Sequence, residues 1–127
     1  MDAKLREELR TEIGGIKTLQ AELSKLFSNR VQLNAQKKEN EVVLEEFNLL
    51  DDDANVFKMV GVTLVKQDLV EAKSNVEKRI EYINGEISRI ENQVKNTESK
   101  LREKEAKITK LQQKVQAAAQ AAAVPAQ

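Results

Sequence analysis

The sequence predicts a mainly α-helical protein: a long antiparallel coiled-coil hairpin of two helices, interrupted in the middle by one β-hairpin. Three observations predict this fold. Two proline-free segments repeat apolar residues about every 3.5 positions, which is the spacing of a left-handed coiled coil. A short β-prone segment with a glycine lies between them. Aromatic residues make up only 3% of the 127 residues, whereas a compact globular core usually draws on more of them.

The first segment, residues 4–47, is expected to form the N-terminal helix. Alternating steps of three and four residues pass through a seam of thirteen positions, nine of them apolar: Leu5, Leu9, Glu12, Ile16, Leu19, Leu23, Leu26, Arg30, Leu33, Lys37, Asn40, Leu44 and Phe47. The pair Gly14 and Gly15 lies inside this segment, and each glycine costs about 1 kcal/mol of helix stability relative to alanine. Two outcomes stay open for the pair: a frayed or bent helix end, or two tolerated surface positions.

The middle segment, residues 48–67, is predicted to form a β-hairpin. The β-prone runs 56–60 and 62–65 flank Gly61, and the run of aspartates at 51–53 ends the preceding helical pattern. Apolar side chains lie on both faces, because Val56 and Val60 alternate with Phe57 and Met59. A lone two-stranded hairpin is marginal in water. We therefore expect it to join the hairpins of other chains; packing on its own helices is the alternative.

The second long segment, residues 68–118, shows the repeat most clearly. Twelve of fourteen seam positions are apolar: Val76, Ile80, Ile83, Ile87, Ile90, Val94, Thr97, Leu101, Lys104, Ile108, Leu111, Val115, Ala118 and Ala122. In an antiparallel pairing about the hairpin, partner numbers sum to roughly 115. Polar seam residues then meet opposite charges, namely Glu12 near Lys104, Arg30 near Glu86, and Lys37 near Glu77. Residues 119–127 form an alanine-rich tail, in which Pro125 stops any helix.

Composition excludes several classes of function. The chain has no Cys and no His, so zinc, haem and Cys-His or Ser-His-Asp catalysis lack their usual residues. With 21 basic and 21 acidic residues, the formal net charge is zero and gives no general attraction to nucleic acid or an anionic membrane. We also expect no membrane span and no secretory signal. The aspartates at 51–53 lack the alternating spacing of a calcium loop and are expected to be solvated.

Several motifs around the predicted hairpin resemble those of a known family. They are the runs Asn55-Val56-Phe57-Lys58-Met59-Val60-Gly61, Leu64-Val65-Lys66-Gln67-Asp68-Leu69 and Val76-Glu77-Lys78-Arg79-Ile80-Glu81-Tyr82-Ile83. Together with the helix–hairpin–helix order, they resemble the β-type subunits of prefoldin, and look most like the subunit 6 group of eukaryotes. The resemblance covers essentially the whole chain as a single domain, with its specific motifs between residues 49 and 83.

The resemblance implies a function without catalysis, cofactor or metal. Prefoldins are six-chain complexes of two α-type and four β-type subunits, whose hairpins form a double β-barrel. They capture unfolded proteins such as actin and tubulin without nucleotide and deliver them to the cytosolic group II chaperonin. A cytoplasmic location follows, with no nucleic-acid or membrane partner. The resemblance assigns subunit assembly through the barrel to Val56, Phe57, Met59, Val60, Leu64 and Val65.

The far ends of the two helices are the expected client-binding tips. The apolar residues there are Leu5, Leu9, Ile13 and Ile16 on the first helix, and Ile108, Leu111 and Val115 on the second. Ile13 lies off the seam and is the best single candidate for an exposed contact; the others are exposed only if the last turns separate. The alternative function is a self-associating coiled-coil scaffold that binds one folded partner.

Overall fold

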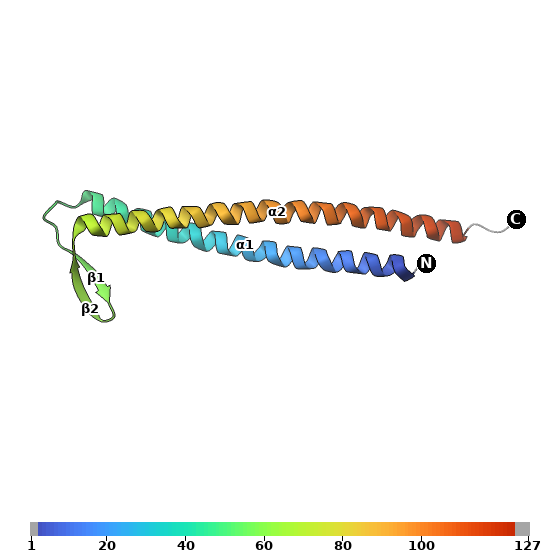
Figure 1. Ribbon diagram of the computed structural model, residues 1–127, viewed down its shortest axis with the longest axis horizontal. Helices are drawn as coiled ribbons and strands as arrows, with labels where there is room; N and C mark the ends of the chain where they lie inside the picture. The colour runs from blue at the N-terminus through green and yellow to red at the C-terminus, as the bar shows by residue number, and fades with distance from the viewer. Residues whose placement is uncertain (1–2, 124–127) are drawn as a thin grey trace. The chain divides into compact units, whose positions relative to one another are not determined.

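The structure is a computed structural model that describes residues 3–123, and its four elements follow the predicted order (Figure 1). Helix α1 spans Ala3–Leu49, strand β1 spans Val56–Val60, strand β2 spans Thr63–Gln67 and helix α2 spans Leu69–Ala123. The predicted fold class, mainly α with one β-hairpin, is confirmed. Helix α2 runs beyond the expected boundary at 118 because the first part of the tail is alanine, the best helix former. Tail residues 124–127 lie outside the described residues.

Residues 1–27 and 92–127 make up one compact unit. In it, the first part of α1 runs antiparallel to the second part of α2 (Figure 1). Leu19, Val94 and Leu111 are buried here, and the other apolar residues of the predicted seam up to Val115 are half-buried. The predicted seam ends there, because Ala118 and Ala122 are exposed. The register of this pair offers no residue of α1 opposite those two alanines within residues 3–123.

Residues 28–91 make up the second unit, which holds the rest of both helices and the hairpin. Val76, Ile83 and Ile90 of α2 are buried, while the α1 seam residues from Arg30 to Phe47 are all half-buried. The 3.5-residue repeat therefore predicted the inward faces of both helices in this unit. Lys37 was expected near Glu77, but the ion pair that the structure gives it is with Glu41 of its own helix, at 3.9 Å.

Strands β1 and β2 pair antiparallel in one two-stranded sheet, with Val56 opposite Gln67 and Val60 opposite Thr63. The two-residue connection is Gly61-Val62, and Gly61 has φ +62°. A positive φ at the first loop residue alone is the pattern of a type II′ turn, which matches the twist of a hairpin. Helix α2 begins directly after β2. The N–H of Ala72 donates to the carbonyl of Asp68 at 2.9 Å, which is a hydrogen bond of the first turn of that helix.

A small apolar cluster holds the hairpin to the helices within this unit. Val56, Leu69 and Ala72 are buried together, and half-buried Phe47 packs against them. Before the hairpin, the N–H of Ala54 donates to the carbonyl of Asp51 at 3.0 Å and closes a tight turn. The acidic run therefore forms the turn that the sequence predicts at the end of α1. This arrangement fixes where the hairpin begins and leaves most of its length outside the cluster.

Candidate functional site

The β-hairpin exposes apolar side chains on both faces. Residues directly opposite each other in an antiparallel pair point to the same side, so Phe57, Met59 and Leu64 share one face. Val60 and Val65 share the other face with Val56. All of these except Val56 are exposed, and Met59 is 70% exposed. Two apolar faces on one short hairpin are the feature that the sequence predicts here.

The edges of the hairpin are also open. The sheet described within residues 3–123 has two strands, so each strand has one edge without a neighbouring strand. An open edge presents a row of backbone N–H and C=O groups that another strand can pair with. Apolar faces and open edges together make the hairpin a surface suited to pairing with strands of another chain.

Val56 differs from the five other residues expected to build the barrel. It is only 9% exposed, and its neighbours are Leu69 and Ala72 of its own chain. Val56 thus joins the hairpin to the helices at one end, while Phe57, Met59 and Leu64 lie on the opposite face of the hairpin. Phe57 also lines a hollow together with Phe47 and Val76. Alternation along a strand predicts two faces, but it does not say which face packs on the helices.

The residues expected at the client-binding tips all belong to the unit of residues 1–27 and 92–127. Leu111 is buried, and five others are half-buried: Leu5, Leu9, Ile16, Ile108 and Val115. Ile13 alone among the seven expected tip residues is exposed, at 40%. The seam is therefore closed at these helix ends, and Ile13 is the one of the seven side chains that is exposed at the surface.

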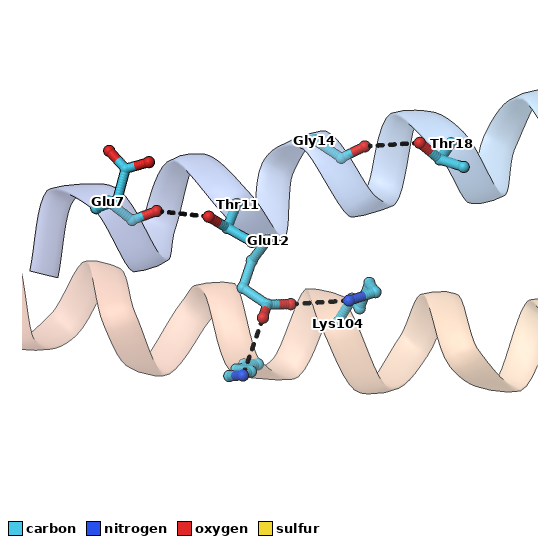
Figure 2. A network of polar contacts seen from close by, with 7 residues as sticks. Glu7, Thr11, Glu12, Gly14, Thr18 and Lys104 are labelled. Atoms are coloured by element: carbon cyan, nitrogen blue, oxygen red, sulfur yellow. Dashed lines mark hydrogen bonds and ion pairs between the residues drawn. The ribbon is translucent and has the colours of Figure 1, made fainter. Parts of the chain in front are cut away.

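A buried acid lies inside this closed seam (Figure 2). Glu12 is 8% exposed, and its carboxylate accepts a hydrogen bond from Lys104 Nζ at 3.1 Å and one from Lys107 Nζ at 2.9 Å. The predicted meeting of Glu12 with Lys104 is confirmed. Lys107 was not predicted, although it lies three residues from Lys104 and so one turn along the same face of α2.

These hydrogen bonds favour the charged form of both Glu12 and Lys107. The pKa of the Glu12 carboxyl is lowered, first by the hydrogen bond from Lys107 and then by that from Lys104, while burial opposes the shift. The pKa of Lys107 is raised, chiefly by its hydrogen bond to Glu12. Glu12 and Lys107 are therefore both charged near neutral pH, and the acid is satisfied rather than reactive. This arrangement suits a register lock and not a general acid or base.

Gly15 makes room for one of these lysines. A Cβ placed on Gly15 would lie 3.0 Å from both Cε and Nζ of Lys104, whereas a Cβ on Gly14 would meet nothing within 4 Å. Both glycines lie inside α1, which is helical on either side of them. The fraying or bending that the sequence left open is not seen, and Gly15 has a packing role that only the register of the two helices reveals.

Within residues 3–123 there is no group of three or more side chains placed to hold a metal ion. No described helix is long and apolar enough to cross a membrane. The chemistry that the described surface offers is association: apolar faces, open strand edges and charged helix flanks.

Comparison with known proteins agrees with this geometry. The profile of the family described as prefoldin subunit matches residues 10–115. The chain belongs to the prefoldin family. A solved structure of the prefoldin β subunit from Thermococcus strain KS-1 superimposes with a TM-score of 0.76 and 26% identity, covering 81% of this chain and 90% of that one.

Prefoldin subunit 6 proteins are similar in sequence. The chain is 45% identical over 85 residues to prefoldin subunit 6 of Arabidopsis thaliana, covering 67% of this chain and 66% of that protein. It is 46% identical over 85 residues to prefoldin subunit 6 of Homo sapiens, with coverage of 67% and 66%. The matched region thus spans about two thirds of these relatives. This prefoldin chain is of the β type and most like subunit 6, as its motifs around the hairpin indicate.

Proposed function

We propose that this prefoldin chain is one β-type subunit of a hetero-hexameric, ATP-independent chaperone. In this proposal its hairpin enters a β-barrel shared with the other subunits, and its helices extend from that barrel as one of six coiled coils. The single observation that carries the proposal is the hairpin with two apolar faces and two open edges, in a chain of this family. A two-stranded hairpin is marginally stable by itself, and strands of other chains would cover the apolar faces that its packing on the helices leaves exposed.

The proposal divides the six hairpin residues into two roles. Phe57, Met59, Val60, Leu64 and Val65 supply the apolar surface that other subunits cover. Val56 supplies the link to the helices, since its side chain packs on Leu69 and Ala72. Assembly would then position the helices through Val56 without needing its side chain at the interface between subunits.

Client capture belongs to the helix ends in this proposal. Unfolded proteins such as actin and tubulin would bind there and pass to the cytosolic group II chaperonin, in the cytoplasm and with no catalytic step. Ile13 is the first contact, because it is exposed while the seam is closed. The seam residues Leu5, Leu9, Ile16, Ile108, Leu111 and Val115 would add to it only where the last turns separate. Several weak tips acting together give useful affinity without a deep pocket.

Solution mass tests the assembly. The chain is measured by light scattering alone, and then after mixing with a prefoldin α-type subunit and the other β-type subunits. Incorporation into a six-chain particle is the expected result. A monomer or dimer that ignores those partners would contradict the proposal and favour the self-associating scaffold instead.

A further inference from the structure

The outer side of helix α1 carries a second row of apolar side chains. Its members are Val31, Ala35, Val42 and Leu49, and all four are exposed, Leu49 at 85%. At about 100° per residue they fall within about 40° of a single line along the helix. Val42 is nine residues from the seam residue Leu33, which is about two and a half turns, so the row lies opposite the seam. The whole row belongs to the unit of residues 28–91.

The spacing of the row is that of a coiled-coil seam. With Lys38 and Glu45 included, its positions follow one another by four and three residues in turn, from 31 to 49. Side chains in the middle of it line a shallow hollow of about 540 Å³: Ala35, Lys38, Glu39, Val42 and Val43. Helix α1 therefore has one 3.5-residue seam that is covered by α2 and a second row of the same spacing that is open.

The flanks of the open row are acidic. Glu39 and Glu46 lie on one side of the apolar line, and Glu45 lies on the other. Along the row, from residue 31 to residue 49, the charged residues are Lys37 and Lys38 against Glu39, Glu41, Glu45 and Glu46, so two positive and four negative charges give a net charge of −2, with Glu41 paired to Lys37. A partner with basic flanks gains from these carboxylates, and a partner with acidic flanks is repelled.

We propose that this row binds a cationic amphipathic helix of another protein. The apolar side of that helix would fill the hollow around Val42, while its Lys or Arg side chains would meet Glu39 and Glu46. A second copy of this chain fits less well, because antiparallel packing would bring Glu39 close to its own counterpart and parallel packing would oppose Lys38 to Lys38. None of its residues is among those assigned to the hairpin interface or to the client-binding tips, so the inference goes beyond the proposed chaperone function.

Three synthetic peptides test the inference by fluorescence anisotropy with the full chain. Each is a helix of about 18 residues, the length of the row, or about five turns. The first has a leucine seam with lysine flanks, the second has the same seam with glutamate flanks, and the third has the lysines with the leucines scrambled. The first should bind at least about tenfold more tightly than the others. Equal binding by the second or third, or no binding by the first, would overturn the proposal.

Substitutions locate the binding. Val42→Glu should weaken binding of the first peptide by about tenfold or more, since it places a charge in the centre of the hollow. The matched control is Val62→Glu in the hairpin turn, where the side chain is 100% exposed and binding should not change. The pair Glu39→Lys and Glu46→Lys should shift preference to the acidic peptide. If Val62→Glu weakens binding as much as Val42→Glu, the peptide lies on the hairpin and the proposal is wrong.

Discussion

Glu12 of helix α1 accepts a hydrogen bond from Lys104 of helix α2 at 3.1 Å, although 92 residues separate the two in the chain. A charge inside an apolar seam adds little stability by itself, because burying it costs solvation. It does favour this register, since a shift of one heptad in either direction leaves the carboxylate with one lysine, Lys100 or Lys114, instead of two. The pair therefore acts as a register lock for the unit formed by residues 1–27 and 92–127.

A charge swap tests the lock. Glu12→Lys and Lys104→Glu should each lower the thermal unfolding midpoint, because each leaves like charges together in the seam. The two changes combined should recover part of the loss, since the ammonium now at position 12 regains a carboxylate at position 104 but still faces Lys107. Adding Lys107→Glu should recover more. If the effect of the double change equals the sum of the two single effects, the direct pairing of Glu12 with Lys104 is contradicted.

The same lock predicts how stability depends on pH. The folded-state pKa of Glu12 is lowered, so its contribution is present above the ordinary pKa of a glutamate and is lost as the pH falls through the folded value. The raised pKa of Lys107 works at the other end, with a contribution lost as the pH rises through its folded value. Urea unfolding between about pH 7 and pH 3 should therefore show a smaller acid loss in Glu12→Gln than in the natural chain. Parallel curves for the two proteins would show that Glu12 does not contribute.

The glycine pair gives a matched comparison inside one helix. Gly14→Ala should stabilise the chain by about 0.5–1 kcal/mol, because alanine favours helix and its Cβ meets open space. Gly15→Ala should gain less, because its Cβ would lie 3.0 Å from the end of the Lys104 side chain, which must move. Urea unfolding measures both.

The control for the glycine pair removes the Lys104 side chain that a Cβ on Gly15 would meet. In a Lys104→Ala background, Gly15→Ala should recover the full gain seen at Gly14. If Gly15→Ala gains as much as Gly14→Ala in the natural chain, Lys104 moves aside without cost and the glycine is not needed for packing.

Much of this arrangement follows from sequence because it is local. A 3.5-residue repeat is a property of one helix, so the inward-facing residues from Leu5 to Phe47 and from Val76 to Val115 could be named without a structure. Once the hairpin sets the direction of the second helix, the meeting of Glu12 with Lys104 follows by counting.

Features that depend on the exact contact between elements could not be predicted. The close contact at Gly15 arises only because the end of the Lys104 side chain lies against this position. Lys37 can reach Glu41 one turn away on its own helix, so it does not need Glu77. The choice of Val56 rather than Phe57 to pack on the helices depends on which side of the hairpin faces them. Each of these is set by tertiary packing.

Phe57 is the sharpest test of the hairpin as an interface. Phe57→Asp should prevent incorporation into the six-chain particle, because a charge on the covered face would be desolvated without a partner. Helix content by circular dichroism should stay nearly unchanged, since Phe57 is exposed in the single chain. Val62→Asp in the turn is the control and should assemble. If Phe57→Asp assembles as well as the natural chain, this face of the hairpin is not part of the interface between subunits.

Ile13 is the corresponding test at the helix ends. Ile13→Ser should weaken suppression of actin aggregation by the assembled particle, because it removes the exposed apolar side chain at the tip while leaving the seam intact. A deletion of residues 1–13 is less clean, since it also removes Glu12 and with it the register lock. Val70→Ser is the matched control, because Val70 is an exposed apolar helix residue that lies in the unit of residues 28–91 and belongs to neither proposed binding surface. The two variants should assemble equally. If Ile13→Ser protects actin as well as Val70→Ser does, Ile13 is not a client contact.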